Sequence, residues 1–559
     1  MIKFKITGLV FILIAVLAFV SKQVFSRGIS NLSSDTTETR IDGDQWGFET
    51  LEFNSIQRNE IAKGYLSSLY PNVLDGLADQ LTHMDFDRSS VFQFNQVGSF
   101  GLHFNGFESA VKSQAYHFLA NYSYQNYDGY RRHSKSFQHV VNMILEASPT
   151  ANSEISITGR YMKGEMRIPG SLTKDEFEKD PFQANSTSSL RDDKRITNEG
   201  RLEIHYLDKF GKKSNNEIEI TPYANLESYD RVTHDYLIIN KLGLGLIANY
   251  LNVTLFSSHK NVFNIRGELL TQPQRTEDYE NYSGNKNYYM EQLTSQKTAK
   301  MILCFSDDLE IFMNKLFALF TVRYDNLIYQ FQEEMLPSRY GKTIYQAITP
   351  TLELKYKLTH RIDIYTSYGL IFNPPADNEL DSPVLAYLYN QGLKAERSGN
   401  FEIGIKGVLI GEDSSSFFSR IKFRASFFNM KTDNELVPYE EYGDLYYRNA
   451  DKSNHLGFII RSMVDIYKNL TIDLLYRFCR FTYGSYTALS LLQDSTGTII
   501  RTNRDFSWKY EPNVPKNYLN ISLLYHHPIG KKINLFAKLS YSGMSGLWVD
   551  DGNSDKTTS

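Results

Sequence analysis

The sequence predicts an all-β protein, namely a transmembrane antiparallel β-barrel. Apolar and polar residues alternate with a period of two in about 18 segments between residue 86 and the end, as they do in strands. Many of these segments approach the roughly 9–11 residues with which a tilted strand crosses a bilayer. The composition also favours strands over helices, because 38 Tyr and 36 Phe stand against only 15 Pro in 559 residues.

Residues 1–26 are predicted to be a secretory signal peptide. Lys3 and Lys5 precede an unbroken apolar run over 9–20, which is shorter than the roughly 20 residues of a membrane-spanning helix. An N-terminal anchor helix is the alternative, but the polar residues that follow end the apolar run early. Residues 27–50 are then expected to form a linker.

The predicted strands each have one apolar and one polar face. In the segment 421–427, for example, Ile421 and Phe423 alternate with Lys422 and Arg424. A soluble sandwich also alternates, but its strands are usually about 5–6 residues long, and many segments here are longer. The polar faces carry Lys, Arg, Glu, Asn and Ser together, which suits a water-filled lumen.

The predicted connections alternate in length, as in an outer-membrane barrel with short turns at one end and long loops at the other. Lipid cannot hydrogen-bond a bare backbone, so strands in a membrane must close on themselves. The short connections are expected at 107–113, 148–152 and 208–213, and the long ones at about 163–199, 271–297 and 371–399.

Charge and cysteine content exclude several classes. Lys+Arg is 60 and Asp+Glu is 64, so the net charge of −4 gives no support to a nucleic-acid partner. Cys304 and Cys479 are too few for a disulfide scaffold, have no zinc-ligand spacing, and are predicted to be packing residues. No paired carboxylate, catalytic triad or phosphate loop is found, so no catalytic residue, no metal ligand and no enzyme activity are assigned.

Several short motifs occur in a characteristic order, and with them the chain resembles the β-barrel of TonB-dependent outer-membrane receptors. The likeness is greatest to the ferric-siderophore branch, which includes ferric-citrate-type receptors. The motifs are DGYRRHS at 128–134, VRYD at 322–325, YTSYG at 365–369 followed by Pro374 and Pro375, FEIGIKG at 401–407, and YRNA at 447–450.

The resemblance implies a barrel of 22 strands with a plugged lumen, and the chain departs from that pattern. Residues 51–85 resemble only a degenerate end of the plug domain, and no TonB box is found. The barrel, residues 86–559, is expected to be C-terminally incomplete, with about 18 strands instead of 22. A truncated receptor, or a fragment of a split receptor gene, is therefore the expectation.

The resemblance also implies a function: an outer-membrane receptor and transporter for a ferric chelate (a siderophore), energised through TonB. Iron would enter only as part of the transported chelate, with no cofactor of the protein's own. The expected partners are the ferric siderophore or a similar small ligand, outer-membrane lipid, and the TonB complex if a full plug exists. The location is the outer membrane of a Gram-negative cell.

Arg131, Arg132 and His133 are the predicted ligand-binding residues, because they lie at the outer end of an early strand and many ferric chelates are anionic. His133 is not predicted to bind metal, and a solvated loop end is the alternative interpretation of all three. Two other functions stay open: a passive porin-like channel, and a fragment without function.

Overall fold

The computed structural model describes residues 88–557, apart from 257–258, 313, 383–388, 411–417, 442–443, 467–468, 494–498 and 530–532, and three further strands before residue 83. The predicted signal peptide and most of the predicted linker lie outside the described residues. No helix among the residues described is long and apolar enough to cross a membrane.

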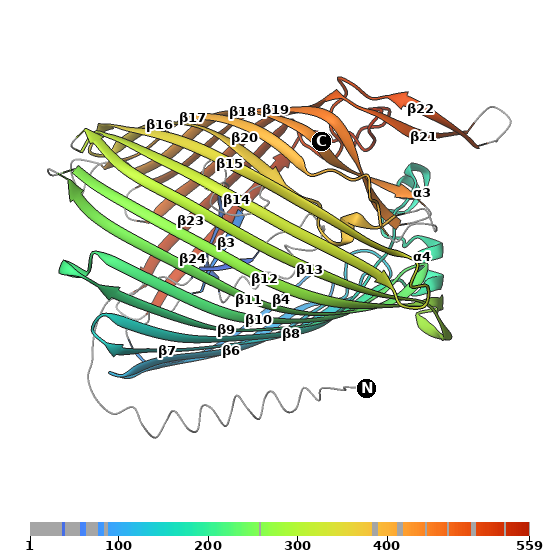
Figure 1. The fold of residues 1–559 in the computed structure, drawn as a ribbon, viewed down its shortest axis with the longest axis horizontal. Helices are drawn as coiled ribbons and strands as arrows, with labels where there is room; N and C mark the ends of the chain where they lie inside the picture. Colours follow the sequence, from blue (N-terminus) through green and yellow to red (C-terminus); the bar gives the residue numbers. More distant parts are fainter. Residues whose placement is uncertain are drawn as a thin grey trace.

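Nineteen strands of the described chain form one large sheet that is ordered as a barrel (Figure 1), one more than the approximate number expected from the sequence. The strands are β4 (Ser90–Gly98), β5 (Leu102–Lys112), β6 (Tyr116–Tyr127), β7 (Ser136–Thr150), β8 (Ser153–Arg167), β9 (Lys194–Phe210), β10 (Asn216–Val232), β11 (Asp235–Phe256), β12 (His259–Tyr282), β13 (Asn285–Phe312), β14 (Leu316–Glu333), β15 (Tyr340–Thr359), β16 (Ile362–Asn373), β17 (Glu396–Ile410), β18 (Phe418–Glu441), β19 (Asp444–Ile466), β20 (Leu470–Ser485), β23 (Asn517–Ile529) and β24 (Ile533–Met544).

The strand β15 illustrates how the period of two builds the wall. Its apolar side chains, such as Ile348 and Leu352, are exposed on the outside, where lipid would cover them. The alternate side chains Thr349, Thr351 and Glu353 are buried on the inside. Since neighbouring strands pair antiparallel and in register, each strand adds to the same apolar outer surface and the same polar interior.

The two ends of the barrel differ in the length of the connections between strands. At the turn end, strands are joined by short links such as 151–152 and 211–215. At the opposite end, here called the loop end, lie the connections 128–135, 168–193, 374–395 and 506–516. The expected long loops at 163–199 and 371–399 and the expected short turns at 148–152 and 208–213 are confirmed in outline.

Two expected connections were wrong. Residues 271–297 belong mostly to β12 and β13, which are joined only by a turn at Ser283 and Gly284. Of the turn expected at 107–113, all but residue 113 lies within β5. The 271–297 stretch has polar residues on both faces, so its sequence resembles a loop. It is nevertheless paired residue by residue, for instance Gln274 with Gln296, because ladder hydrogen bonds to the neighbouring strand override the lack of a lipid-facing side.

The first and last strands of the barrel lie next to each other in the strand order. An odd number of alternating strands makes β4 and β24 run in the same direction, whereas the other neighbours pair antiparallel. Both strands are exposed over nearly their whole length. Among the described residues, β24 and β4 share fewer contacts than any other two neighbours in the strand order.

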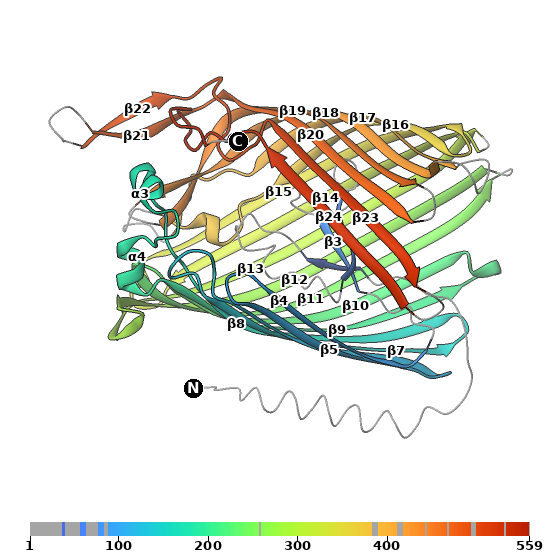
Figure 2. The ribbon, with the colours of Figure 1, turned by 180° about the vertical axis from the view of Figure 1, so that it is seen from behind.

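The remaining elements lie apart from the barrel sheet. The helices α3 (Lys174–Lys179) and α4 (Ser186–Arg191) and the hairpin of β21 (Thr487–Gln493) and β22 (Ile499–Asp505) occupy the same end of the barrel in Figures 1 and 2. The short 3-10 turns are η1 (Lys212–Ser214) and η2 (Asn378–Leu380).

The predicted plug remnant at 51–85 contributes β2 (Ile56–Ala62) and β3 (Leu77–Thr82), which form a small sheet with β1 (Thr36–Thr39) in the order β1-β3-β2. Figures 1 and 2 draw this sheet within the outline of the barrel. The assignment of 51–85 to a plug, like the other predicted domain boundaries, stays a prediction.

Candidate functional site at the loop end of the barrel

Arg131 joins two connections of the loop end. Its Nε donates a hydrogen bond to the carbonyl of Gln183 at 3.0 Å, and its Nη2 donates one to the carbonyl of Pro169 at 3.3 Å. Both acceptors belong to the connection 168–193. The guanidinium therefore joins 168–193 to the shorter connection 128–135. Arginine suits this role because its planar guanidinium carries several N–H donors and can bind two carbonyls at once.

His133 has a similar position. Its backbone is left-handed, with φ at 56°, and its side chain is only 8% exposed. The Nε2 atom lies 3.1 Å from the carbonyl oxygen of Asp193 and 3.8 Å from the carboxylate of Asp192. The imidazole is thus directed into the base of the 168–193 connection.

Arg132 differs from its two neighbours because its side chain is 70% exposed. Its backbone N–H donates to the carbonyl of Phe182 at 2.8 Å, and its guanidinium pairs with the carboxylate of Asp180. The structure thus brings all three predicted residues to the loop end, and Arg132 presents most surface to solvent. Their part in ligand binding stays a prediction.

The connection 168–193 is built by two capped helices. Thr173 and Glu176 form a reciprocal capping box at the start of α3, and hydrogen bonds from the Thr173 backbone and hydroxyl lower the pKa of Glu176. Asn185 caps α4 in the same manner by accepting from the backbone of two residues. Apolar side chains of both helices and of the segment between them face solvent: Phe177 of α3, Leu190 of α4, and Phe182.

The connection 374–395 folds against the inside of the barrel wall. Leu380 is 0% exposed, and the ring of Tyr389 stacks on Phe331 of β14 with centroids 4.2 Å apart. The hydroxyls of Tyr329 and Tyr345 donate to the carbonyls of Pro375 and Leu393, each at 2.8 Å. The sequence predicted a long connection at about 371–399, but it did not predict this aromatic cluster.

An ion pair and two hydrogen bonds tie the same connection to distant strands. The Nζ atom of Lys241, on β11, lies 2.6 Å from a carboxylate oxygen of Asp377. On the other side, Asn449 of β19 accepts from the backbone of Lys394 at 2.8 Å and donates to its carbonyl at 2.9 Å. Because β11 and β19 are far apart in the strand order, the described parts of this connection, 374–382 and 389–395, contact widely separated parts of the barrel wall.

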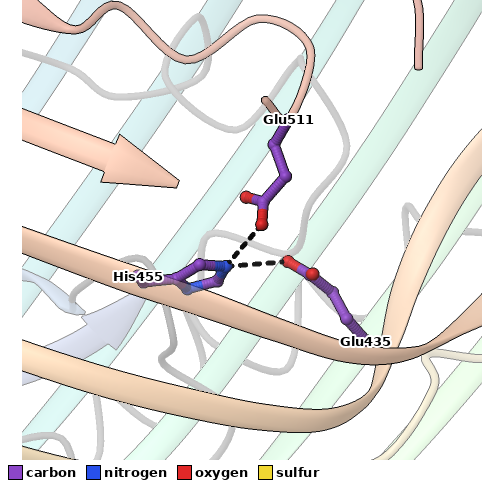
Figure 3. A group of neighbouring side chains, drawn as sticks. All are labelled: Glu435, His455 and Glu511. Carbon is purple, nitrogen blue, oxygen red and sulfur yellow. Dashed lines mark hydrogen bonds and ion pairs between the residues drawn. The ribbon is translucent and has the colours of Figure 1, made fainter. Parts of the chain in front are cut away.

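A third group lies on the inner face of the wall, where β18, β19 and the connection 506–516 meet (Figure 3). His455 of β19 has its Nε2 atom 2.8 Å from Glu511 Oε1 and 3.3 Å from Glu435 Oε1. Burial and the neighbouring charge of Glu435 raise the pKa of Glu511 to about 7. Sequence reasoning missed this group, since its members lie far apart in the chain and belong to no motif.

A single sheet of long antiparallel strands, apolar outside and polar inside, with long loops at one end, defines an outer-membrane β-barrel of the receptor type. The chain belongs to the TonB dependent receptor-like, beta-barrel family, whose model matches residues 169–559. This family consists of transport receptors of the Gram-negative outer membrane and not of enzymes, as the sequence had indicated.

Solved structures have the same fold at low sequence identity. The unliganded ferric citrate transporter FecA is 13% identical, with a TM-score of 0.68 over 88% of this chain and 71% of its own. The siderophore receptor PiuA from Acinetobacter baumannii is 13% identical, with a TM-score of 0.70 over 90% and 78%. The ferric yersiniabactin uptake receptor FyuA from Yersinia pestis is 14% identical, with a TM-score of 0.64 over 86% and 72%.

Proposed function

We propose that this protein is an outer-membrane receptor that binds a ferric chelate at its loop end and admits it to the periplasm with energy from the TonB complex. The observation that carries the proposal is membership of the receptor family together with a fold shared by transporters named for ferric citrate and siderophores. The 168–193 and 374–395 connections would then form the receptor's binding face.

Within that face, the exposed side chains suit an anionic chelate with an organic shell. Arg132 offers a guanidinium, which pairs with carboxylate and similar oxygen anions through two parallel hydrogen bonds. Phe177 and Phe182 offer exposed apolar surface beside it. Arg131 and His133, whose side chains are directed into the connection 168–193, would position this surface and not contact the chelate.

The test is uptake by iron-starved cells that depend on this gene. Cells with the gene deleted should lose accumulation of radioactive iron supplied as ferric citrate or as one member of a siderophore panel, and a plasmid copy should restore it. Uptake should also be lost when TonB is deleted. Unchanged uptake of every chelate in the deletion strain would contradict a transport role.

A passive porin-like channel is the competing function, and planar bilayers separate the two. A receptor should give little or no steady conductance, whereas a wide and continuously open pore would support the channel. Reconstitution of the purified protein, with a known trimeric porin as the positive control, provides the measurement.

A further inference from the structure

Three side chains from three separate segments converge on one point inside the barrel. Glu435 comes from β18, His455 from β19 and Glu511 from the connection 506–516 (Figure 3). One donor atom from each lies within 4.8 Å of the other two. The imidazole is held in place by stacking on Phe481, with ring centroids 4.3 Å apart. The donors are therefore brought together by the fold and oriented by packing.

The hydrogen bonding of this group is incomplete. A single Nε2–H of His455 faces both carboxylates, and one N–H cannot serve two acceptors well. The second oxygen of Glu435 and the Nδ1 atom of His455 are buried and have no hydrogen-bond partner among the residues that the structure describes. A buried, unpaired carboxylate oxygen is costly, so the arrangement calls for a further positive group.

The charges support the same conclusion. His455 is 6% exposed and Glu511 is 8% exposed, so water screens these two charges little. The Oε1 atoms of both carboxylates lie within 3.3 Å of the same nitrogen of one imidazole.

We propose that Glu435, His455 and Glu511 form a binding site for one divalent transition-metal ion of the Zn²⁺ class. Carboxylate and imidazole ligands suit such an ion, which binds them at about 2.0–2.2 Å. Ligand atoms around a tetrahedral ion at that distance lie about 3.3–3.5 Å apart. The observed separations of 2.8 and 3.3 Å need only a small outward shift, and a water molecule completes the fourth position.

The ion would add a direct link between three separate segments of the chain. Glu511 lies in the connection 506–516, which leads into β23 and runs beside the end of β20. One contact with β20 is the hydrogen bond that the Glu511 N–H donates to the carbonyl of Phe481 at 3.2 Å. Bound metal would fasten this connection to β18 and β19 and so stiffen the loop end. This site is separate from any iron carried as a chelate, and it does not depend on the proposed transport function.

The direct test is metal binding by the purified full-length protein in detergent, stripped with EDTA and then titrated with Zn²⁺ in the absence of any chelate. We expect one Zn²⁺ per chain, measured by equilibrium dialysis and elemental analysis, with a Kd below about 10 μM. Glu511→Gln and Glu435→Gln keep the side-chain shape but remove a charged ligand, and each should weaken binding at least tenfold.

The matched control is Glu146→Gln, because Glu146 also pairs with a histidine, His117, at 3.7 Å, and among the described residues this pair belongs to no group of three possible metal ligands. This variant should bind Zn²⁺ as the wild type does. A wild type that takes up no stoichiometric Zn²⁺, or folded Glu511→Gln and Glu435→Gln variants with wild-type affinity, would overturn the proposal. If one variant does not fold, as judged by its heat-modifiable migration on gels, the other carries the comparison.

A second readout follows the connection itself. Lys509 is exposed and lies two residues before Glu511, so trypsin cleavage there reports how firmly 506–516 is held. Zn²⁺ should slow this cleavage several-fold in the wild type and leave it unchanged in Glu511→Gln. Equal protection of both proteins by Zn²⁺ would mean that the ion acts elsewhere.

Discussion

At the scale of single residues, Gly404 shows how a short motif serves packing. The ring of Tyr365 on the neighbouring strand lies over Gly404, so closely that an added Cβ would be 2.6 Å from the ring. This position lets the Tyr365 hydroxyl donate to Glu402 at 2.7 Å and accept from Arg424 at 3.2 Å. The glycine at 404 thus leaves the room that the Tyr365 ring occupies.

We therefore expect Gly404→Ala to displace the Tyr365 ring and to destabilise the barrel by about 1–3 kcal/mol, the usual cost of overpacking. The measurement is the midpoint of urea unfolding in phospholipid vesicles. Gly159→Ala is the control, because a Cβ at Gly159 would meet nothing within 4 Å. Equal midpoints for both variants would contradict the packing argument.

Arg131 and Arg132 are adjacent, yet their surroundings assign them different roles. Arg131→Ala removes two hydrogen bonds from a charged donor to loop carbonyls, each worth about 1.5–3 kcal/mol, so trypsin should cut 168–193 faster at Lys174 or Arg191. Arg132→Ala removes an exposed ion pair, worth about 0–1 kcal/mol, and should leave that cleavage nearly unchanged.

Under the proposed function, Arg132→Ala should instead weaken binding of the transported ferric chelate to whole cells. Faster cleavage of 168–193 in Arg132→Ala, but not in Arg131→Ala, would reverse the two assignments.

At the scale of elements, the described parts of the connection 374–395, here called the strap, join distant strands at the loop end. The strap is held by the aromatic cluster around Leu380 and Tyr389 and by the ion pair of Lys241 with Asp377. The aromatic cluster is buried and apolar, whereas the ion pair joins the strap to Lys241 of β11. The two parts can therefore be tested separately.

Lys241→Ala leaves the partly buried carboxylate of Asp377 without this cation and should loosen the strap by about 1.5–3 kcal/mol. We expect trypsin to cleave after the exposed Lys394 roughly tenfold faster, since about 1.4 kcal/mol corresponds to a factor of ten. Lys241→Arg keeps the charge and should cleave at the wild-type rate. Equal cleavage rates of Lys241→Ala and Lys241→Arg would show that the ion pair does not hold the strap.

At the scale of the whole molecule, the outward apolar surface makes the protein a membrane barrel. Leu352 lies in the middle of the apolar outer face of β15 and is 46% exposed in the protein alone. On one side it is paired with Phe320 of β14 and on the other with Tyr368 of β16, so the surface continues from strand to strand. The polar interior needs water or other protein groups, which a closed wall can enclose.

Leu352→Arg should destabilise the barrel in lipid by about 2–4 kcal/mol, the cost of a cation near the bilayer midplane. Tyr340→Arg, at the loop end of the same strand, should cost only about 0–1 kcal/mol, because an arginine there reaches the interface. Urea unfolding in vesicles measures both. Equal costs at the two positions would mean that β15 does not cross the bilayer as described.

The sequence could predict the strands because their signal is local. Alternation along one strand depends only on which face each side chain takes, and that follows from backbone geometry wherever a strand forms. The same rule failed at 271–297, where β12 and β13 have polar residues on both faces, so that no apolar face marks the strands. There, pairing with neighbours decided the structure.

By itself, the sequence determined the class of protein: the period of two built the barrel wall, and the motif order indicated the receptor family. Only the tertiary structure decided which side chains meet. It directed Arg131 and His133 into a neighbouring connection, joined the described parts of 374–395 to distant strands, and placed Glu435, His455 and Glu511 together. The physical reason is that these contacts join residues far apart in the chain, and their positions depend on strand register and loop docking, which no local pattern encodes.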